Sequence, residues 1–490
     1  MRVCLINPPR IQPKLWGKPS VLQPLDIAYI AAVLGKKHRV HIIDVANEGW
    51  KNLELINGTK YRQGLNNKDI AIRIKKWAPD VVGITIPFSG WWSPAYEVAS
   101  IIKGIDENIT TVLTGLDPSA RPEACLSHPN IDCVVIGEPE ETMRELVEVL
   151  ERGGTKGLKK TRGIGYAENG KTRLTSPRPL IQNLDSLPFP ARHLLPMETY
   201  FAAVKENPLR GEIRRPWTAM ITSRGCPYGC IFCSVHNVMG RQWRGRSPEN
   251  VVDEIEQLVH TYRVKQIDFM DENMTLDKKR METICDLIVK RRLDVEWYTP
   301  NGVRADTLDE NLLSRMKAAG CKKIRIAPES GVQHVVDQII KKNLSLEAVE
   351  RAVVSSKKVG IKVGCFFVIG LIGETKQDIE ATINYAYKLR KLGAEGFHFS
   401  IATPVYGTDL YEQAKTGGLL RACFGDEALA AAEPLIETPE FTADDLRELC
   451  ARANLVNPTF TREKVLRAVR NPRKAIKILL EKMNREQEHN

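Results

Sequence analysis

The sequence predicts an α/β protein with two parallel β/α units: an N-terminal doubly wound, Rossmann-like sheet in residues 1–153 and a partial (β/α)6 barrel in residues 206–415. Five apolar segments rich in β-branched residues alternate with helical patterns in the first unit, which is typical of a doubly wound parallel sheet. Six further strand-like segments alternate with helices in the second unit, as in a parallel barrel. Strand patterns then stop, and residues 416–490 are predicted to form a small helical C-terminal region.

The predicted strands of the first unit end in loops, and such loops are where open parallel sheets bind ligands. No G-x-G-x-x-G sequence follows the first strand, so a nicotinamide or flavin dinucleotide is not indicated. The predicted strands are residues 3–7, 40–44, 81–86, 111–114 and 133–136, and the predicted helices span about 24–36, 67–77, 93–105, 120–127 and 139–152.

Residues 154–205 are predicted to be a linker that contains a hairpin. The sequence YAENGKTR provides turn residues between two short extended pieces. The sequence SPRPLIQNLDSLPFPARHLLP then carries five prolines, which disfavour a regular helix or strand. We expect this part to wrap over a surface as an ordered linker.

The barrel unit is expected to carry its active groups at the carboxyl ends of its strands. One helix start is well defined, because Ser247 is a good cap and Pro248 suits the first helical position. The predicted strands are residues 219–223, 266–270, 296–299, 323–327, 363–369 and 396–402, and the predicted helices are 248–262, 277–291, 309–319, 345–359 and 375–392.

The amino-acid composition is that of a globular protein without a membrane-spanning segment. With 43% hydrophobic and 27% charged residues the chain reads as globular, and no apolar segment approaches the roughly 18 residues of a membrane span. We expect no signal peptide, and eleven cysteines without a disulfide framework fit the reducing cytoplasm. Much of the net charge of +11 falls in residues 461–490, a basic amphipathic segment that is either a solvated face or an attraction for an anionic substrate. No nucleic-acid-binding module is recognisable.

Cys226, Cys230 and Cys233 form a CxxxCxxC pattern directly after the first barrel strand. Three closely spaced thiolates suit an iron–sulfur cluster, and without a fourth local cysteine a 4Fe–4S cubane would keep one iron open for another ligand. A zinc site with His236 as fourth ligand is one alternative, and plain buried cysteines are another. The spacing and the flanking Pro227 and Gly229 favour the cluster.

Several motifs, in order along the chain, resemble those of the cobalamin-dependent (class B) radical S-adenosylmethionine (AdoMet) enzymes. The resemblance covers residues 1–415. Its most specific part is the cysteine loop, and the N-terminal unit would be the cobalamin-binding type of Rossmann-like domain. Other matching segments are IDFMDENMTLD, NGVRAD, IRIAPESG, FFVIGLIGET and SIATPVYGTDLY in the barrel, and LINPP, QPLDIAYIAAVL, DVVGIT, IDCVVIGEPEET and NLDSLPFPAR before it.

The resemblance implies that the three cysteines hold the cluster and that strand-end residues of the barrel bind AdoMet. Some of these residues have a structural alternative: loop packing for Phe232, a helix cap for Asp271, and an ion pair with Asp306 for Arg304, whose guanidinium could otherwise pair with the AdoMet carboxylate. The implied AdoMet-binding residues are Phe232, Asp271, Glu272, Arg304, Glu329, Ser330 and Gly370.

The resemblance also implies a cobalamin site on the loops of the first sheet. The chain lacks a D-x-H-x-x-G sequence, so the corrinoid would be held base-off with no protein histidine ligand. In TGLDPS, Leu116 and Asp117 replace the Gly and His common in the family. The implied cobalamin-binding residues are Pro8, Pro9, Thr85, Pro87, Gly115, Leu116, Gly137 and Glu138.

The activity implied is methyl transfer from methylcobalamin to an unactivated carbon, or a phosphorus, of a small metabolite, and the basic surplus is compatible with an anionic one. The alternatives are a radical cyclisation or rearrangement with the same cofactors, and a non-enzymatic electron-transfer protein. Expected partners are the substrate and an electron donor such as flavodoxin or ferredoxin, with no nucleic acid and no membrane. The oligomeric state is not indicated.

Overall fold

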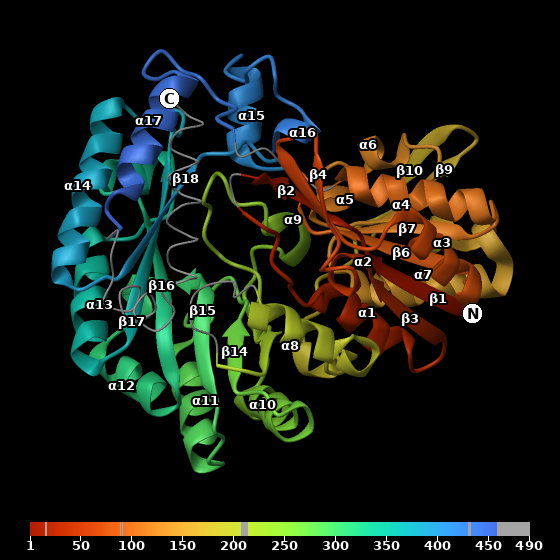
Figure 1. The fold of residues 1–490 in the computed structure, drawn as a ribbon, viewed down its shortest axis with the longest axis horizontal. Coiled ribbons are helices and arrows are strands. Elements are labelled where there is room, and N and C mark those ends of the chain that lie inside the picture. The colour runs from red at the N-terminus through yellow and green to blue at the C-terminus, as the bar shows by residue number, and fades with distance from the viewer. Residues whose placement is uncertain (15–16, 89, 91, 207–213, 430–432, 458–490) are drawn as a thin grey trace.

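The computed structural model describes residues 1–14, 17–88, 90, 92–206, 214–429 and 433–457. Two lobes lie side by side, an N-terminal sheet with its helices and a barrel, with helices of the C-terminal region above the barrel (Figure 1). The basic segment 461–490 and the rest of the predicted tail beyond residue 457 lie outside the described residues. No helix in the described part of the chain is both long and apolar enough to cross a membrane.

The N-terminal sheet has seven strands in the order β10-β9-β8-β7-β6-β1-β3. All five predicted parallel strands are present, and each residue of β6 is buried because helices cover both faces of the sheet. The predicted hairpin is also present, and it joins this sheet by pairing β9 antiparallel to β8. The strands are β1 (Arg2–Asn7), β3 (Arg39–Asp44), β6 (Val81–Ile86), β7 (Thr110–Gly115), β8 (Cys133–Val135), β9 (Ile164–Glu168) and β10 (Lys171–Leu174).

The helices pack in two layers on this sheet. One face packs with α1 and α7, and the other with α3, α4 and α6. The helix expected at 120–127 is present as a helix that starts at Pro122, where proline suits the first turn, and a short helix that was not predicted precedes it. The helices are α1 (Leu25–Leu34), α3 (Asn67–Trp77), α4 (Trp92–Ile105), α5 (Leu116–Ala120), α6 (Pro122–Leu126) and α7 (Pro139–Gly153).

Several elements were not predicted. A small antiparallel sheet of three four-residue strands follows no strong alternation of apolar and polar residues. The proline-rich segment contains short 3-10 turns, and a helix follows its last proline. These elements are β2 (Arg10–Pro13), β4 (Leu53–Ile56), β5 (Lys60–Gln63), α2 (Val45–Glu48), η4 (Leu184–Ser186), η5 (Arg192–Leu194) and α8 (Met197–Glu206).

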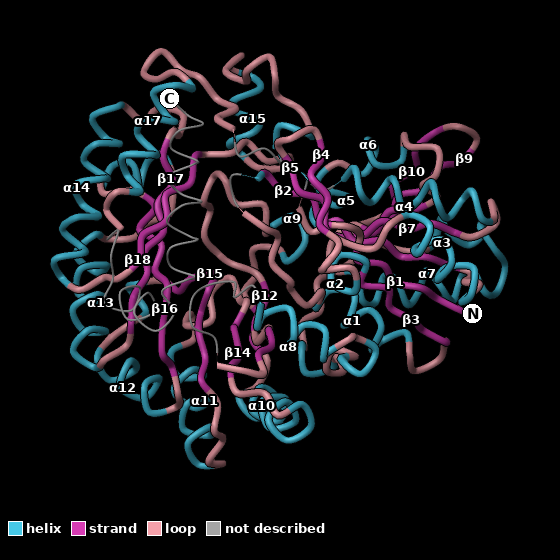
Figure 2. Tube along the Cα trace, viewed as in Figure 1, coloured by secondary structure: helices cyan, strands magenta, loops and turns pink. Residues whose placement is uncertain are grey.

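The barrel is a six-stranded parallel sheet in the order β11-β14-β15-β16-β17-β18, as predicted. Its helices lie on the outer side of the strands (Figure 2), and the apolar core lies between the two layers. The elements are β11 (Trp217–Met220), α10 (Pro248–Tyr262), β14 (Gln266–Phe269), α11 (Lys278–Lys290), β15 (Glu296–Val303), α12 (Glu310–Ala318), β16 (Cys321–Glu329), α13 (Leu346–Val359), β17 (Lys362–Ile369), α14 (Lys376–Leu392) and β18 (Gly396–Ile401).

Short elements complete the barrel. The antiparallel pair β12 (Ser223–Arg224) and β13 (Arg244–Gly245) flanks the cysteine loop, which contains α9 (His236–Met239). The described C-terminal region is helical, as expected, and α17 packs against β18. Its helices are α15 (Asp409–Thr416), α16 (Asp426–Leu429) and α17 (Ala443–Asn454).

Candidate active site

The cysteine loop lies at the mouth of the barrel, after β11, and is closed at its base. Arg224 and Arg244 are paired across β12 and β13, and the amide of Cys226 donates a hydrogen bond to the carbonyl of Gly240 at 3.4 Å. Gly225 has a φ of +81°, and a Cβ there would come within 2.2 Å of the Gln242 carbonyl oxygen. A glycine is therefore required where the two ends of the loop meet.

The cysteine loop carries three free thiols. All three are half-buried and unpaired, and burial raises the pKa of the Cys230 thiol to about 11, an effect that the nearby Lys342 opposes. His236 is not placed as a fourth ligand, because its Nε2 lies 3.1 Å from the carbonyl oxygen of Cys226. Within the described ranges no group of His, Cys, Asp or Glu side chains is arranged to hold a single metal ion.

A buried ion pair lies beside these thiols. Lys342 Nζ is 2.7 Å from Glu329 Oε1, and both residues are less than 9% exposed. Glu329 has a φ of +67°, uncommon for a residue other than glycine, where the register of β16 and β17 shifts. Our sequence interpretation named Glu329 and missed Lys342. The signal available was the Lys341–Lys342 pair shortly after the fourth barrel strand.

Arg304 is engaged within the protein. Its guanidinium binds Asp306 through two nitrogens, at 3.0 and 2.7 Å, and donates to the carbonyl oxygens of Lys342 and Asn343. It also lies over the ring of Tyr228 in the cysteine loop, 3.6 Å from the centroid. The pair with Asp306 is thus present, and Arg304 links the cysteine loop to the segment that carries Lys342.

Asp271 and Glu272 differ in their surroundings although they are adjacent. Asp271 is buried and accepts hydrogen bonds from the amide and hydroxyl of Thr222 and from the hydroxyl of Ser223. It therefore holds the strand that leads into the cysteine loop. Burial, and then the charge of Asp271, raise the pKa of the Glu272 carboxyl to about 7. Glu272 in turn raises the pKa of Cys226 and Cys233, after the larger effect of burial.

The remaining residues that were expected to bind AdoMet are Ser330, Gly370 and Phe232, and each has contacts within the protein. Ser330 turns toward α14, where its hydroxyl lies 2.9 Å from that of Thr382. Gly370, at a φ of +82°, donates its amide to Glu374 at 2.7 Å. Burial raises the pKa of Glu374 to about 8, and among the described residues its Oε1 has no partner. Phe232 packs at the edge of the apolar cluster that includes Ile231.

The expected cobalamin-binding residues lie on or beside the cobalamin-side loops, which are the loops at the carboxyl ends of β1, β6, β7 and β8. Gly115 has a φ of +115°, and a Cβ there would come within 2.4 Å of the Ile86 carbonyl oxygen. A Cβ at Gly137 would meet nothing within 4 Å, so this backbone borders open space. The hydroxyl of Thr85 donates to Asp26. Pro8 and Pro9 are buried, and Pro87 and Leu116 are half-buried.

Two carboxylates at the cobalamin-side loops are paired with arginines. Glu138 accepts from Arg224 at 3.0 Å and from Arg244 at 2.8 Å, across the boundary between the lobes. Asp117 is fully buried and binds Arg121 through two nitrogens, at 2.7 and 3.1 Å. The structure thus gives Glu138 a contact between the lobes that the sequence did not reveal.

Comparison with known proteins agrees with this arrangement. The model of the radical SAM superfamily matches residues 220–386, and that of the B12 binding domain matches residues 19–147. An uncharacterized methyltransferase of Pyrococcus horikoshii is 35% identical, over 95% of this chain and 94% of its own. The cytidylyl-2-hydroxyethylphosphonate methyltransferase of Streptomyces wedmorensis is 29% identical over 89% and 86%. An anaerobic magnesium-protoporphyrin IX monomethyl ester cyclase of Rubrivivax gelatinosus is 30% identical over 71% and 61%.

The fold is shared with the radical S-adenosylmethionine methyltransferase TsrM from Kitasatospora setae, solved with cobalamin and a [4Fe-4S] cluster bound. That chain superimposes with a TM-score of 0.66 at 18% identity, over 86% of this chain and 79% of its own. The protein belongs to the radical SAM enzymes that carry an N-terminal B12-binding domain. Two relatives that match 95% and 89% of this chain are both named as methyltransferases.

Proposed function

We propose that this enzyme transfers a methyl group from cobalamin to an unactivated carbon, or to phosphorus, of a small anionic metabolite. The single observation that supports it most is that the cysteine loop and the cobalamin-side loop are joined directly: Arg224, two residues before Cys226, binds Glu138, the residue after Gly137. Bound there, a 4Fe-4S cluster with AdoMet and a corrinoid would supply radical formation and methyl donation.

The residues of the barrel mouth have separate roles in this proposal. Cys226, Cys230 and Cys233 hold the cluster and leave one iron open. Lys342, rather than Arg304, pairs with the AdoMet carboxylate, because four contacts within the protein already engage the Arg304 guanidinium. Glu329 orients Lys342, and the remaining expected AdoMet residues line or support the mouth.

The cobalamin site is proposed on the cobalamin-side loops, at the carboxyl ends of β1, β6, β7 and β8. No histidine occurs in the sequence of the loops that directly follow these strands or β3, and this supports a base-off corrinoid without a protein nitrogen ligand. Base-off binding is tested by the electron paramagnetic resonance spectrum of bound cob(II)alamin. Splitting from an axial nitrogen would contradict it.

The reaction is tested with anaerobically reconstituted enzyme, a flavodoxin or ferredoxin as reductant, and candidate anionic acceptors that include phosphonates. Methyl transfer predicts both 5′-deoxyadenosine and S-adenosylhomocysteine. The cyclase relative makes a radical reaction without methyl transfer the second candidate, and it predicts 5′-deoxyadenosine alone. We place the enzyme in the reducing cytoplasm, which suits eleven free cysteines.

A further inference from the structure

A buried ionic network joins the start of α7 to the strands that close the cysteine loop. Glu140 binds Arg224 through both oxygens, at 2.5 and 3.2 Å. Glu138 binds both Arg224 and Arg244, and its Oε2 also accepts the amide of Ile181 at 2.7 Å. These four charged side chains are 2–4% exposed. All four carboxylate oxygens are therefore satisfied away from water.

The network connects residues adjacent to both cofactor loops. Glu138 directly follows Gly137 in the cobalamin-side loop, and Arg224 precedes Gly225 and Cys226. Since Arg224 and Arg244 are opposite each other in the β12–β13 pair, the carboxylates bind both strands at the base of the cysteine loop. A shift of α7 against the barrel would thus move both ends of that loop.

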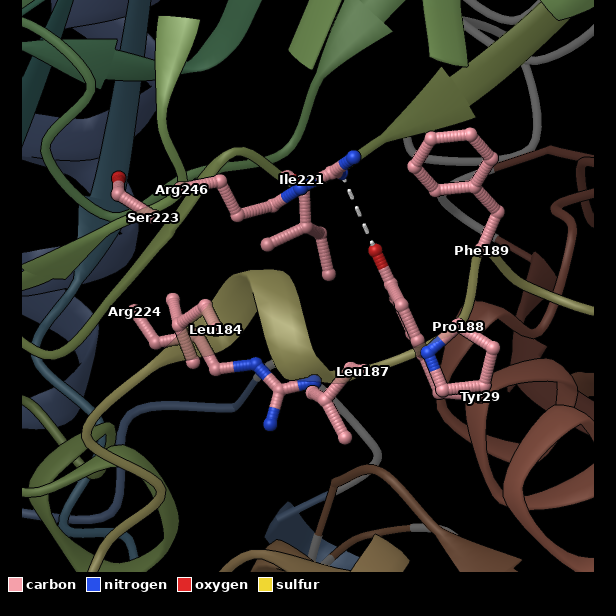
Figure 3. Close-up of a pocket in the computed structure, with 9 residues that line it drawn as sticks. All are labelled: Tyr29, Leu184, Leu187, Pro188, Phe189, Ile221, Ser223, Arg224 and Arg246. Carbon is pink, nitrogen blue, oxygen red and sulfur yellow. Dashed lines mark hydrogen bonds between the residues drawn. The ribbon is translucent and has the colours of Figure 1, made fainter. Parts of the chain in front are cut away.

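Further contacts of Arg224 and of Arg246, the residue after β13, extend the network to α1 and α10. Arg224 lies over the ring of Tyr29 in α1, 5.3 Å from its centroid, and the Tyr29 hydroxyl accepts a hydrogen bond from Arg246 at 3.5 Å (Figure 3). A cavity of about 10 Å³ lies among these side chains, room for about one water molecule. Arg246 continues the contacts to Glu254 in α10. The two strands are held between the lobes.

We infer that the network formed by Glu138, Glu140, Arg224 and Arg244 sets the separation between the cluster and the corrinoid. The four are positioning residues, because their carboxylates and guanidinium groups bind one another and act through the two loops. A substrate between two cofactors reacts only when both are placed within fractions of an ångström, and a loosened supporting contact costs rate without removing a reactive group. The inference rests on the two cofactors of the family and holds for either proposed reaction.

The test uses Glu140→Gln, which keeps the size of the side chain and removes its charge. Glu148→Gln is the matched control, because Glu148 lies on the same helix and pairs with Lys37, whose side chain is 64% exposed. Hydrogen exchange is measured first, on cofactor-free protein. We expect faster exchange at residues 223–226 in Glu140→Gln, with unchanged exchange in β16 of the barrel core.

The second readout is the distance between the spins of the reduced cluster and bound cob(II)alamin, from pulsed electron paramagnetic resonance. We expect the distance distribution of Glu140→Gln to broaden by about twofold, with iron and cobalamin content retained, while Glu148→Gln matches the unmodified enzyme. An unchanged distribution would overturn the inference. So would exchange that rises equally in β16, since that shows a general loss of structure. If Glu140→Gln binds no cluster, Arg224→Lys, which keeps the charge but not the paired contacts, is measured in the same way.

Discussion

Glu254 lies between two buried arginines, and its replacement by glutamine should destabilise the barrel strongly. Its Oε1 accepts from Arg192 at 2.6 Å and its Oε2 from Arg246, and the carboxylate is completely buried. Glutamine keeps the shape but leaves two guanidinium groups without a counter-charge. Removing one partner of a buried ion pair costs about 3–5 kcal/mol.

That loss of unfolding free energy can be converted to a decrease in melting temperature. A unit of about 200 residues loses about 2–4 °C per kcal/mol, so Glu254→Gln should melt about 6–20 °C lower than the unmodified protein. The assay is anaerobic thermal unfolding of the reconstituted protein by circular dichroism. Glu310→Gln is the control, because Glu310 pairs with Lys358 on the surface, where both side chains are more than half exposed. That change should cost less than about 1 kcal/mol.

The pH dependence of stability provides a second check on the role of the Glu254 carboxylate. Burial raises the pKa of Glu254, but Arg192 and Arg246 outweigh it and hold that pKa below the usual value. A lowered pKa means that the stabilisation is fully present above the unfolded value of about 4.3 and is lost as pH falls through the folded value. Glu254→Gln should therefore lose less stability on acidification than the unmodified protein. Two results for Glu254→Gln would refute the reasoning. One is a melting temperature within about 2 °C of that of the unmodified protein, and the other is the same loss of stability at acid pH as in the unmodified protein.

Three further changes address the cofactor sites. Cys230→Ala should abolish the visible absorbance of the reconstituted cluster, whereas Cys423→Ala, an exposed cysteine outside the loop, should retain it. Lys342→Met should weaken AdoMet binding by roughly tenfold or more, as expected for a lost charged hydrogen bond of about 1.5–3 kcal/mol, with iron content unchanged; equal affinity in calorimetry would count against its role. Gly115→Ala should lose cobalamin binding, because the new methyl group would meet the Ile86 carbonyl oxygen at 2.4 Å. Gly104→Ala, with nothing within 4 Å, should leave corrinoid absorbance intact.

Most of the fold could be predicted from the periodicity of apolar residues and from the lengths of the segments between them. Many parallel strands of the two large sheets are continuous apolar runs, such as β6, or alternate, such as β18, so they could be predicted from their own residues. The small sheet containing β2 could not, because its strands have only four residues each and β2 depends on pairing with β5, about 50 residues away. The five-residue helix α5 was also missed, because one turn of helix has too few residues to show a periodic pattern.

At the site, the sequence indicated which residues carry charge but not which partner each would have. Glu138 and Arg304 were interpreted as cofactor ligands from their motifs, and the structure shows arginine and backbone partners for them. Lys342 has no motif of its own and is identified only by its contact with Glu329, thirteen residues earlier. Hydrogen-bond partners follow from the tertiary fold, and a local pattern of residues cannot specify them.

The network between α7 and the cysteine loop also has a consequence for synthesis of the protein. Its carboxylates precede their arginines by 84–106 residues in the chain. At about 5–20 residues per second, the ribosome makes these carboxylates about 4–21 s before the arginines that pair with them. During that interval Glu138 and Glu140 remain hydrated on an incomplete surface, and the desolvated pairs form only when β12 and β13 have been made. The order of translation therefore prepares the cobalamin lobe as the template against which the cysteine loop is set.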